Sequence, residues 1–211
     1  MKRLLLFLTA LSLVASCAGK TPTTRPALED HGEILANIRK TMPVACEYKG
    51  RAIVNYQALN DDGTEDLATF LVLVDKECTN NIIVKVLGSF GVVTAELSVT
   101  NGQYKIFQRG EQVQESVPTK LTNEDLVLIE EYLNLPPPLP DNYSLMVHSG
   151  EHYMFIKDDN SYIFVNKDFL IDKIVTASYQ VNYRWSGNRL KAMAFFKDGA
   201  SVDVEFSEPW R

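Results

Sequence analysis

The sequence predicts a mainly β fold with some helix (α+β): a curved, incompletely closed antiparallel β-barrel of about 11 strands, with helices covering its concave face. Many short runs alternate apolar and polar residues, and turn-forming residues separate these runs. Two further segments carry apolar residues at helical spacing instead. The chain has 211 residues, 45% of them hydrophobic, which suits one globular domain.

The N-terminal residues have the features of an export signal. Lys2 and Arg3 precede an apolar run over residues 4–15, which is too short to span a bilayer as a mature helix. The stretch VASC, which ends at Cys17, resembles the lipobox of bacterial lipoproteins. This resemblance implies that residues 1–16 are a lipoprotein signal peptide and that the cysteine carries acyl chains such as palmitate. The alternative is an ordinary signal peptide that contains a cysteine by chance.

The resemblance to lipoproteins also implies how the mature chain is organised. Residues 17–26 comprise the lipidated cysteine and a flexible, small and polar tether. Residues 27–211 then form the folded domain. Ala18 follows the cysteine, and by the sorting rule of enteric-type bacteria a residue other than Asp there favours the outer membrane.

The first elements predicted in the folded part are a helix and a β-hairpin. A helix over residues 28–42 ends at Pro43 and has one apolar stripe, made of Leu28, Ile34, Leu35, Ile38 and Met42. Two strands, 48–59 and 67–77, flank the polar turn NDDGTED. Pairing them about Asp62 gives an apolar face, with Val54–Phe70, Ala52–Val72 and Tyr56–Ala68, and a polar face, with Lys49–Asp75 and Asn55–Thr69.

The same register predicts a disulfide. It places Cys46 opposite Cys78, and directly opposed residues of an antiparallel pair lie within disulfide reach. Thiols of an exported chain tend to be oxidised. We therefore expect a bond between these two cysteines, and the alternative is two buried free thiols.

The rest of the chain reads as strands around one more helix. Thr122 is positioned to cap this helix, whose apolar stripe comprises Leu126, Ile129, Tyr132 and Leu133. The proline-rich segment 135–140 ends it as a stiff connector. Alternating runs predict strands at residues 81–87, 92–100, 103–108, 113–117, 143–147, 153–157, 162–166, 173–178, 181–185, 189–196 and 201–206.

The sequence contains no convincing catalytic or metal-binding constellation, so we expect a non-enzymatic protein without metal or cofactor. Of the histidines, His31 stands alone, while His148 and His152 flank a turn beside Glu151; turn histidines are more often solvated than metal-bound. A net charge of -6 argues against nucleic-acid binding. Ten Phe, nine Tyr and two Trp instead favour a large apolar interior. A curled sheet could leave part of it hollow for an acyl chain, or pack it solid.

The stretch from Ala27 to Thr100 resembles the LolA/LolB lipoprotein-carrier superfamily and is closest to the outer-membrane lipoprotein receptor LolB. The helix LEDHGEILANI, the strand YKGRAIVNY and the segment IIVKVLGSFGVVTAELSV carry the resemblance. Phe90-Gly91 stands where the family has Leu-Gly, and Ser89 stands where it has Pro.

The resemblance implies a lipid-anchored monomer of the outer membrane that faces the periplasm. It would receive lipoproteins from a periplasmic lipoprotein carrier, bind their acyl chains as a chaperone does, and insert them into outer-membrane lipid. Phe90, between Gly88 and Gly91, would be the membrane-insertion loop; the alternative is that its ring folds back onto the sheet. The cavity would be lined by Val54, Phe70, Val72, Val84, Val86 and Leu97 of the sheet and by Ile34, Ile38, Leu126 and Ile129 of the helices.

Two other functional hypotheses remain open on the sequence. One is a structural or assembly lipoprotein of the cell envelope that has the same fold and a filled core. The other is an envelope enzyme whose site has no sequence signature. A hollow between helices and sheet separates the carrier hypothesis from the first of these.

Overall fold

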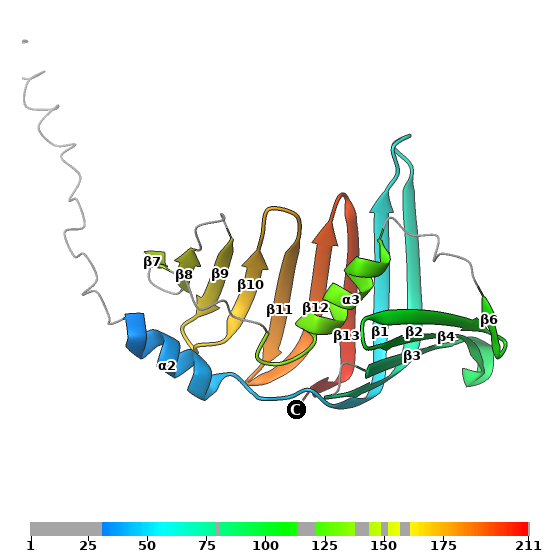
Figure 1. Ribbon diagram of the computed structural model, residues 1–211, viewed down its shortest axis with the longest axis horizontal. Coiled ribbons are helices and arrows are strands. Elements are labelled where there is room, and N and C mark those ends of the chain that lie inside the picture. The colour runs from blue at the N-terminus through cyan, green and yellow to red at the C-terminus, as the bar shows by residue number, and fades with distance from the viewer. Residues whose placement is uncertain are drawn as a thin grey trace, which may run out of the picture.

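A single antiparallel sheet of 13 strands makes up most of the structure (Figure 1). The computed structural model describes residues 31–78, 81–113, 121–137, 144–148, 152–156 and 161–210. The strands are β1 (Tyr48–Leu59), β2 (Glu65–Glu77), β3 (Asn81–Leu87), β4 (Val93–Thr100), β5 (Gln103–Gln108), β6 (Glu111–Val113), β7 (Ser144–His148), β8 (His152–Ile156), β9 (Tyr162–Asn166), β10 (Ile171–Val175), β11 (Gln180–Ser186), β12 (Arg189–Lys197) and β13 (Ala200–Trp210).

The strand order shows why the sheet stays open. It runs β6-β5-β4-β3-β2-β1-β13-β12-β11-β10-β9-β8-β7, so β6 and β7 are its two edges and are not paired with each other. Figure 1 shows the curvature, because β1 and β2 stand upright while β3 and β4 run nearly across them. The predicted curved, incompletely closed antiparallel architecture is confirmed. The sheet has 13 strands where about 11 were expected, although every strand has a counterpart among the predicted runs.

The predicted hairpin register is confirmed pair by pair. Val54 faces Phe70, Ala52 faces Val72, and Lys49 faces Asp75. On the polar face the Lys49 ammonium lies 2.8 Å from the Asp75 carboxylate. Opposed charges on one side and opposed apolar groups on the other fix this register, because a slip of one residue would exchange the two faces.

Two helices in the described residues lie against the sheet. Helix α2 (His31–Thr41) buries Ile34 and Ile38, as its predicted stripe requires. Helix α3 (Asn123–Tyr132) begins at the predicted cap, where Thr122 and Asp125 form a capping box. Neither helix is long and apolar enough to cross a membrane.

The path of the chain explains why α3 crosses the concave face. The strands before it end at edge strand β6 and the strands after it begin at the opposite edge strand, β7, so the connection must traverse the sheet. The described part of this connection contacts the sheet at separate strands: α3 touches β4 and β5, and the Tyr183 hydroxyl of β11 donates a hydrogen bond of 3.0 Å to the carbonyl oxygen of Tyr132.

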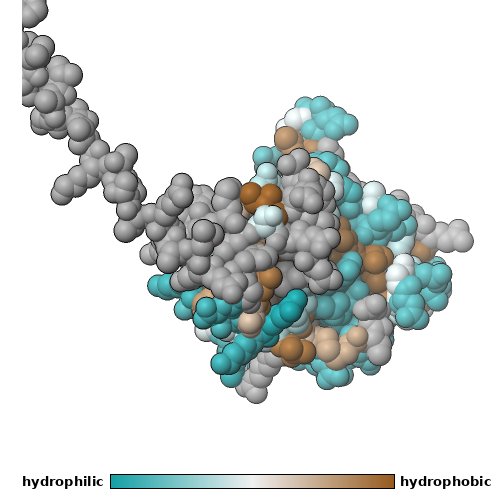
Figure 2. Space-filling view, turned by 60° about the vertical axis from the view of Figure 1, so that its left-hand side comes forward, coloured by the Kyte–Doolittle hydropathy of each residue, from teal (hydrophilic) through white to brown (hydrophobic). Residues whose placement is uncertain are grey.

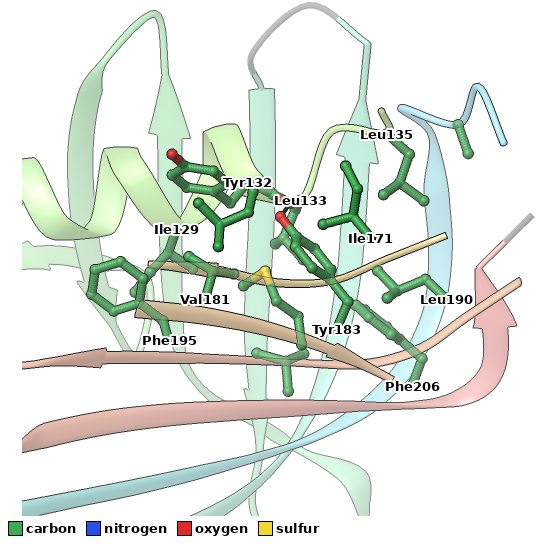
Figure 3. Packing of buried hydrophobic residues seen from close by; sticks show 14 of the residues in the cluster. Ile129, Tyr132, Leu133, Leu135, Ile171, Val181, Tyr183, Leu190, Phe195 and Phe206 are labelled. Atoms are coloured by element: carbon green, nitrogen blue, oxygen red, sulfur yellow. Dashed lines mark hydrogen bonds between the residues drawn. The ribbon is translucent and has the colours of Figure 1, made fainter. Parts of the chain in front are cut away.

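Around β9–β12 the sheet carries many buried hydrophobic residues. Figure 3 shows Tyr132, Leu133 and Leu135 lying over residues of these strands, among them Val181 and Tyr183. Phe195, Ile171 and Leu190 are fully buried there. A cavity lies over the part of the sheet from β13 through β1 to β6.

Cys46 and Cys78 are joined by a disulfide that closes the base of the β1–β2 hairpin. The two residues are 32 positions apart. On the chain-entropy model a loop of this length contributes about 3–4 kcal/mol to the free energy of unfolding.

We expect the double variant Cys46→Ser, Cys78→Ser to lose about this much stability, because its unfolded chain regains the freedom of the loop. Urea unfolding of both proteins under oxidising conditions measures the difference. Reducing the wild-type protein should bring its unfolding midpoint to that of the variant. An unchanged midpoint in the variant would contradict the prediction.

Candidate functional site

A cavity of about 560 Å³ lies between α3 and the concave face of the N-terminal half of the sheet. Its wall is almost entirely apolar. The aliphatic and aromatic residues of the wall are Val54, Tyr56, Leu67, Ala68, Phe70, Val72, Val74, Ile82, Val84, Val86, Ala95, Leu97, Val99, Ile106, Val113, Leu121, Leu126, Ile129, Leu133, Val202, Val204 and Phe206. Pockets of 300–1,000 Å³ with apolar walls are typical of sites for small hydrophobic ligands.

Of the residues predicted to line the cavity, those of the strands and α3 do so and those of α2 do not. The structure places all six strand residues on the cavity wall, namely Val54, Phe70, Val72, Val84, Val86 and Leu97, together with Leu126 and Ile129 of α3. It does not place Ile34 and Ile38 there, so that part of the expectation is corrected. Helix α3 passes over the cavity, whereas Ile34 and Ile38 of α2 are buried in the hydrophobic core outside the residues that line it.

Part of the wall comes from a strand that sequence reasoning did not assign to the site. Val202, Val204 and Phe206 of β13 line the cavity beside β1. They stand opposite Tyr56, Val54 and Ala52 in the register, and so share the inward face of the hairpin.

The cavity is closed at one end and open at the other. Along the inward face of β2, exposure rises from 1% at Val72 to 40% at Phe70, and Asp66 at the start of the strand is exposed. Ile82, Val99 and Leu121 are buried at the closed end. A ligand would therefore enter between the start of β2 and the end of β5, where Gln108 is exposed on the rim.

A buried ion pair joins β2 to α3 at the closed end. The Lys76 ammonium donates a hydrogen bond to the Glu130 carboxylate, and the exposed fractions of their side chains are 0% and 5%. Lys76 stands opposite Ile82, and Glu130 forms part of the cavity wall. The buried charge of Lys76 is tolerated because the Glu130 carboxylate contacts it directly.

A second ion pair holds the N-terminal end of α3 on β12. The Lys197 ammonium lies 2.7 Å from the Asp125 carboxylate. Burial alone would raise the pKa of Asp125, but hydrogen bonds from Lys197 and Thr122 outweigh it and lower the pKa below its usual range. The same contact raises the pKa of Lys197. Helix α3 is thus fixed to the sheet near both ends, which defines the width of the cavity.

The loop between β3 and β4 carries an apolar tip beside the open end. The inward residues Val86 and Ala95 line the cavity just before and just after this loop. Phe90 at its centre is fully exposed, and Val92 and Val93 are exposed beside it. We call Phe90, Val92 and Val93 the apolar tip. Figure 2 shows that hydrophobic residues also reach the surface in patches among hydrophilic ones on the face that it presents.

The backbone of this loop is left-handed at its tip. Phe90 itself adopts the left-handed region (φ 61°), as does Gly91 (φ 74°), whereas Gly88 is extended. A Cβ at Gly88 would lie 2.5 Å from the Cγ2 atom of Thr94, so this glycine is needed for space. A left-handed phenylalanine is strained, and such strain is commonly found at functional positions.

The described residues contain no cluster of three or more side chains suited to a metal ion. His152 of β8 lies 3.4 Å from Asp172 of β10, across the intervening strand β9, and both side chains are partly exposed. The side chains of His31 and His148, and Glu151 as a whole, lie outside the described residues. So do residues 1–30, including Cys17 and the predicted signal peptide and tether.

Comparison with known proteins found 13 similar chains among solved structures, including the following two. A LolA-superfamily protein from Nitrosomonas europaea is 15% identical, with a TM-score of 0.45 over 85% of this chain and 92% of that chain. A domain described as an outer-membrane lipoprotein-sorting protein from Vibrio parahaemolyticus is 10% identical, with a TM-score of 0.44 over 84% of this chain and 90% of that chain. At these values neither similarity supports a statement about function. No protein-family model and no curated protein matches the chain.

Proposed function

We propose that this protein is a non-enzymatic acyl-chain carrier that accepts lipoproteins and helps to insert them into the outer membrane. The observation that carries the proposal is the apolar cavity of about 560 Å³, which opens beside the exposed apolar tip. An acyl chain in the cavity would bury its apolar surface against apolar side chains and away from water, and the tip would contact lipid.

The sequence resemblance to LolB supports the finer parts of this proposal. An acylated Cys17 would hold the domain at the periplasmic face of the outer membrane through the tether of residues 17–26. A periplasmic lipoprotein carrier would deliver the cargo, whose acyl chains would enter the cavity and then leave it for the lipid bilayer at the tip.

Lipid bound to the purified protein tests the first half of the proposal. A chain that begins at residue 18 lacks the anchor but retains every residue that the structure describes. Native mass spectrometry of this chain is expected to detect bound species that extraction identifies as acylated. A ligand-free protein that also fails to bind an added fluorescent acyl probe would contradict the proposal and favour a structural lipoprotein.

The apolar tip provides a separate prediction. Phe90→Glu is expected to weaken membrane contact by roughly tenfold or more, because a buried Phe contributes about 1.5–3 kcal/mol that a carboxylate cannot replace. The side chain is fully exposed, so the free energy of unfolding should change by no more than about 0.5 kcal/mol. The assay follows transfer of an acylated protein from a soluble complex to liposomes.

Phe90→Leu is the matched control, since it keeps an apolar side chain on the same left-handed backbone. It should retain most of the transfer rate. If Phe90→Glu unfolds at a much lower temperature than the wild type, the ring packs on the protein and is not a membrane contact. If Phe90→Glu transfers as fast as Phe90→Leu, the tip has no role in delivery.

A further inference from the structure

Part of strand β2 has a neighbouring strand on one side only. β2 pairs with β1 from Glu65 to Lys76, but its pairing with β3 begins only at Leu71. Residues 65–70 therefore present a free strand edge, although β2 is an inner strand of the sheet. Figure 1 shows this part of the β1–β2 hairpin rising above β3. We call residues 65–70 the free edge; at about 3.3 Å per residue it is about 20 Å long.

The hairpin shows which backbone groups of the free edge are unpaired. The Asn60 amide donates a hydrogen bond to the carbonyl oxygen of Thr64, so the backbone groups of Thr64 point toward β1. These groups alternate between the two sides of a strand. The N–H and C=O groups of Leu67 and Thr69 therefore point away from β1, where β3 has already ended. No backbone hydrogen bond joins them to a described residue on that side.

The free edge lacks most of the features that protect strand edges. Proteins usually block an edge with proline or lysine, distort it with a bulge, or keep the strand very short. The sequence of the free edge, EDLATF, has no proline or lysine, and its pairing with β1 has no bulge. Its only charges are the two acidic residues at its start. All of its residues except the half-buried Ala68 are exposed, so an extended chain can reach it.

The free edge is also the rim of the cavity. Asp66, Leu67, Ala68 and Phe70 line the cavity at its open end. A ligand whose acyl chain lies inside would leave the group that carries the chain beside these residues. Where that group is a polypeptide, its first residues outside the cavity meet the unpaired N–H and C=O groups of the free edge.

We propose that the free edge binds, as an added β-strand, the peptide segment that follows the acylated residue of a cargo lipoprotein. This proposal rests on the carrier function proposed above and adds a second contact for the same ligand. Strand addition uses main-chain hydrogen bonds and therefore accepts different side-chain sequences, as a carrier of several lipoproteins requires. Because the acyl chain and the peptide are covalently linked, pairing at the edge increases the affinity for the whole ligand.

One acyl ligand with and without a peptide tests the proposal. The ligands are palmitoylated cysteine and the same residue followed by a short neutral peptide of serine and threonine. Each displaces the fluorescent probe N-phenyl-1-naphthylamine from the chain that begins at residue 18. We expect the peptide to increase the affinity at least about tenfold. Equal affinities would overturn the proposal and leave acyl binding intact. Failure of both ligands to displace the probe would overturn the proposed function itself.

Thr69→Pro tests whether the free edge causes this gain. Thr69 lies outside the cavity wall, and proline removes only its edge-facing N–H. The variant is expected to lose the tenfold gain and to bind palmitoylated cysteine as the wild type does. Thr69→Ala is the matched control: it also loses the hydrogen bond of 2.9 Å to the Asn55 side chain, but it keeps the N–H and should keep the gain. A gain retained by Thr69→Pro would refute the proposal.

Methylated ligands provide a second measurement on the wild-type protein, which decides the question if circular dichroism shows that Thr69→Pro is unfolded. In an added strand, alternate amides face the edge. Methylating one alternate set of peptide nitrogens is expected to remove the gain, and methylating the other set to preserve it. Equal effects of the two sets would overturn the proposal. So would a concentration-dependent dimer that Thr69→Pro abolishes in size-exclusion chromatography, because the free edge would then pair with a second copy.

Discussion

Replacing Lys76 by methionine is expected to lower the free energy of unfolding by about 3–5 kcal/mol. The methionine has a similar length, so the packing of the closed end changes little. What changes is that Glu130 becomes a buried carboxylate with no charged partner, at a side-chain exposure of 5%. Removing one member of a buried pair leaves the full desolvation cost of the other, and equilibrium urea unfolding measures it.

The double variant Lys76→Met, Glu130→Leu separates a lost ion pair from lost packing. It should regain most of the stability, because an apolar pair of similar volume removes both charges from the interior. Lys49→Met is the surface control. It breaks an ion pair of 2.8 Å on the same hairpin, but the two side chains are 82% and 44% exposed, so little change is expected. A double variant as unstable as Lys76→Met would contradict this account.

The buried pair could have been found in the sequence. Lys76 has the same parity along its strand as Phe70 and Val72, which places it on the inward face of the hairpin. Glu130 follows Leu126 by four residues and therefore lies on the same side of α3. Two opposite charges, each on an otherwise apolar face, are a recognisable signal for a buried pair.

Most of the cavity-lining residues on the sheet could be predicted because they lie on strands that are paired with their neighbours in the sequence. The hairpin register depends on residues close together in sequence, and alternation then assigns each residue to a face. The pairing of β1 with β13 joins the two ends of the described chain, so no local pattern indicates that Phe206 faces the cavity. The strand order that brings α3 over the cavity and leaves Ile34 and Ile38 outside it is equally nonlocal.

The carrier and the structural-lipoprotein hypotheses differ in what lies under α3. A structural lipoprotein with a packed core would have no cavity between α3 and the sheet. At the C-terminal end of α3 the chain packs on β11, where the Tyr183 hydroxyl donates a hydrogen bond to the carbonyl oxygen of Tyr132. Over β1–β5 the inward residues are mostly valine, alanine and leucine, and they line the cavity under α3.

Filling that cavity from the wall is therefore expected to abolish acyl binding while preserving the fold. Val84 and Leu97 are cross-strand partners that both face the hollow. Tryptophan at both positions would occupy space that the structure leaves empty, so we expect the affinity for N-phenyl-1-naphthylamine to fall by at least about tenfold. Fluorescence titration of the chain beginning at residue 18 measures this.

The neighbouring pair on the same two strands provides the control. Ile83 and Ser98 are also cross-strand partners, but they lie on the opposite face of the sheet. Ile83→Trp, Ser98→Trp adds the same side chains without entering the cavity, and it should bind the probe as the wild type does. The two variants add the same two tryptophans to opposite faces of the sheet. Equal binding by both would therefore mean that the probe binds elsewhere. Carrier function would then have no basis in this hollow.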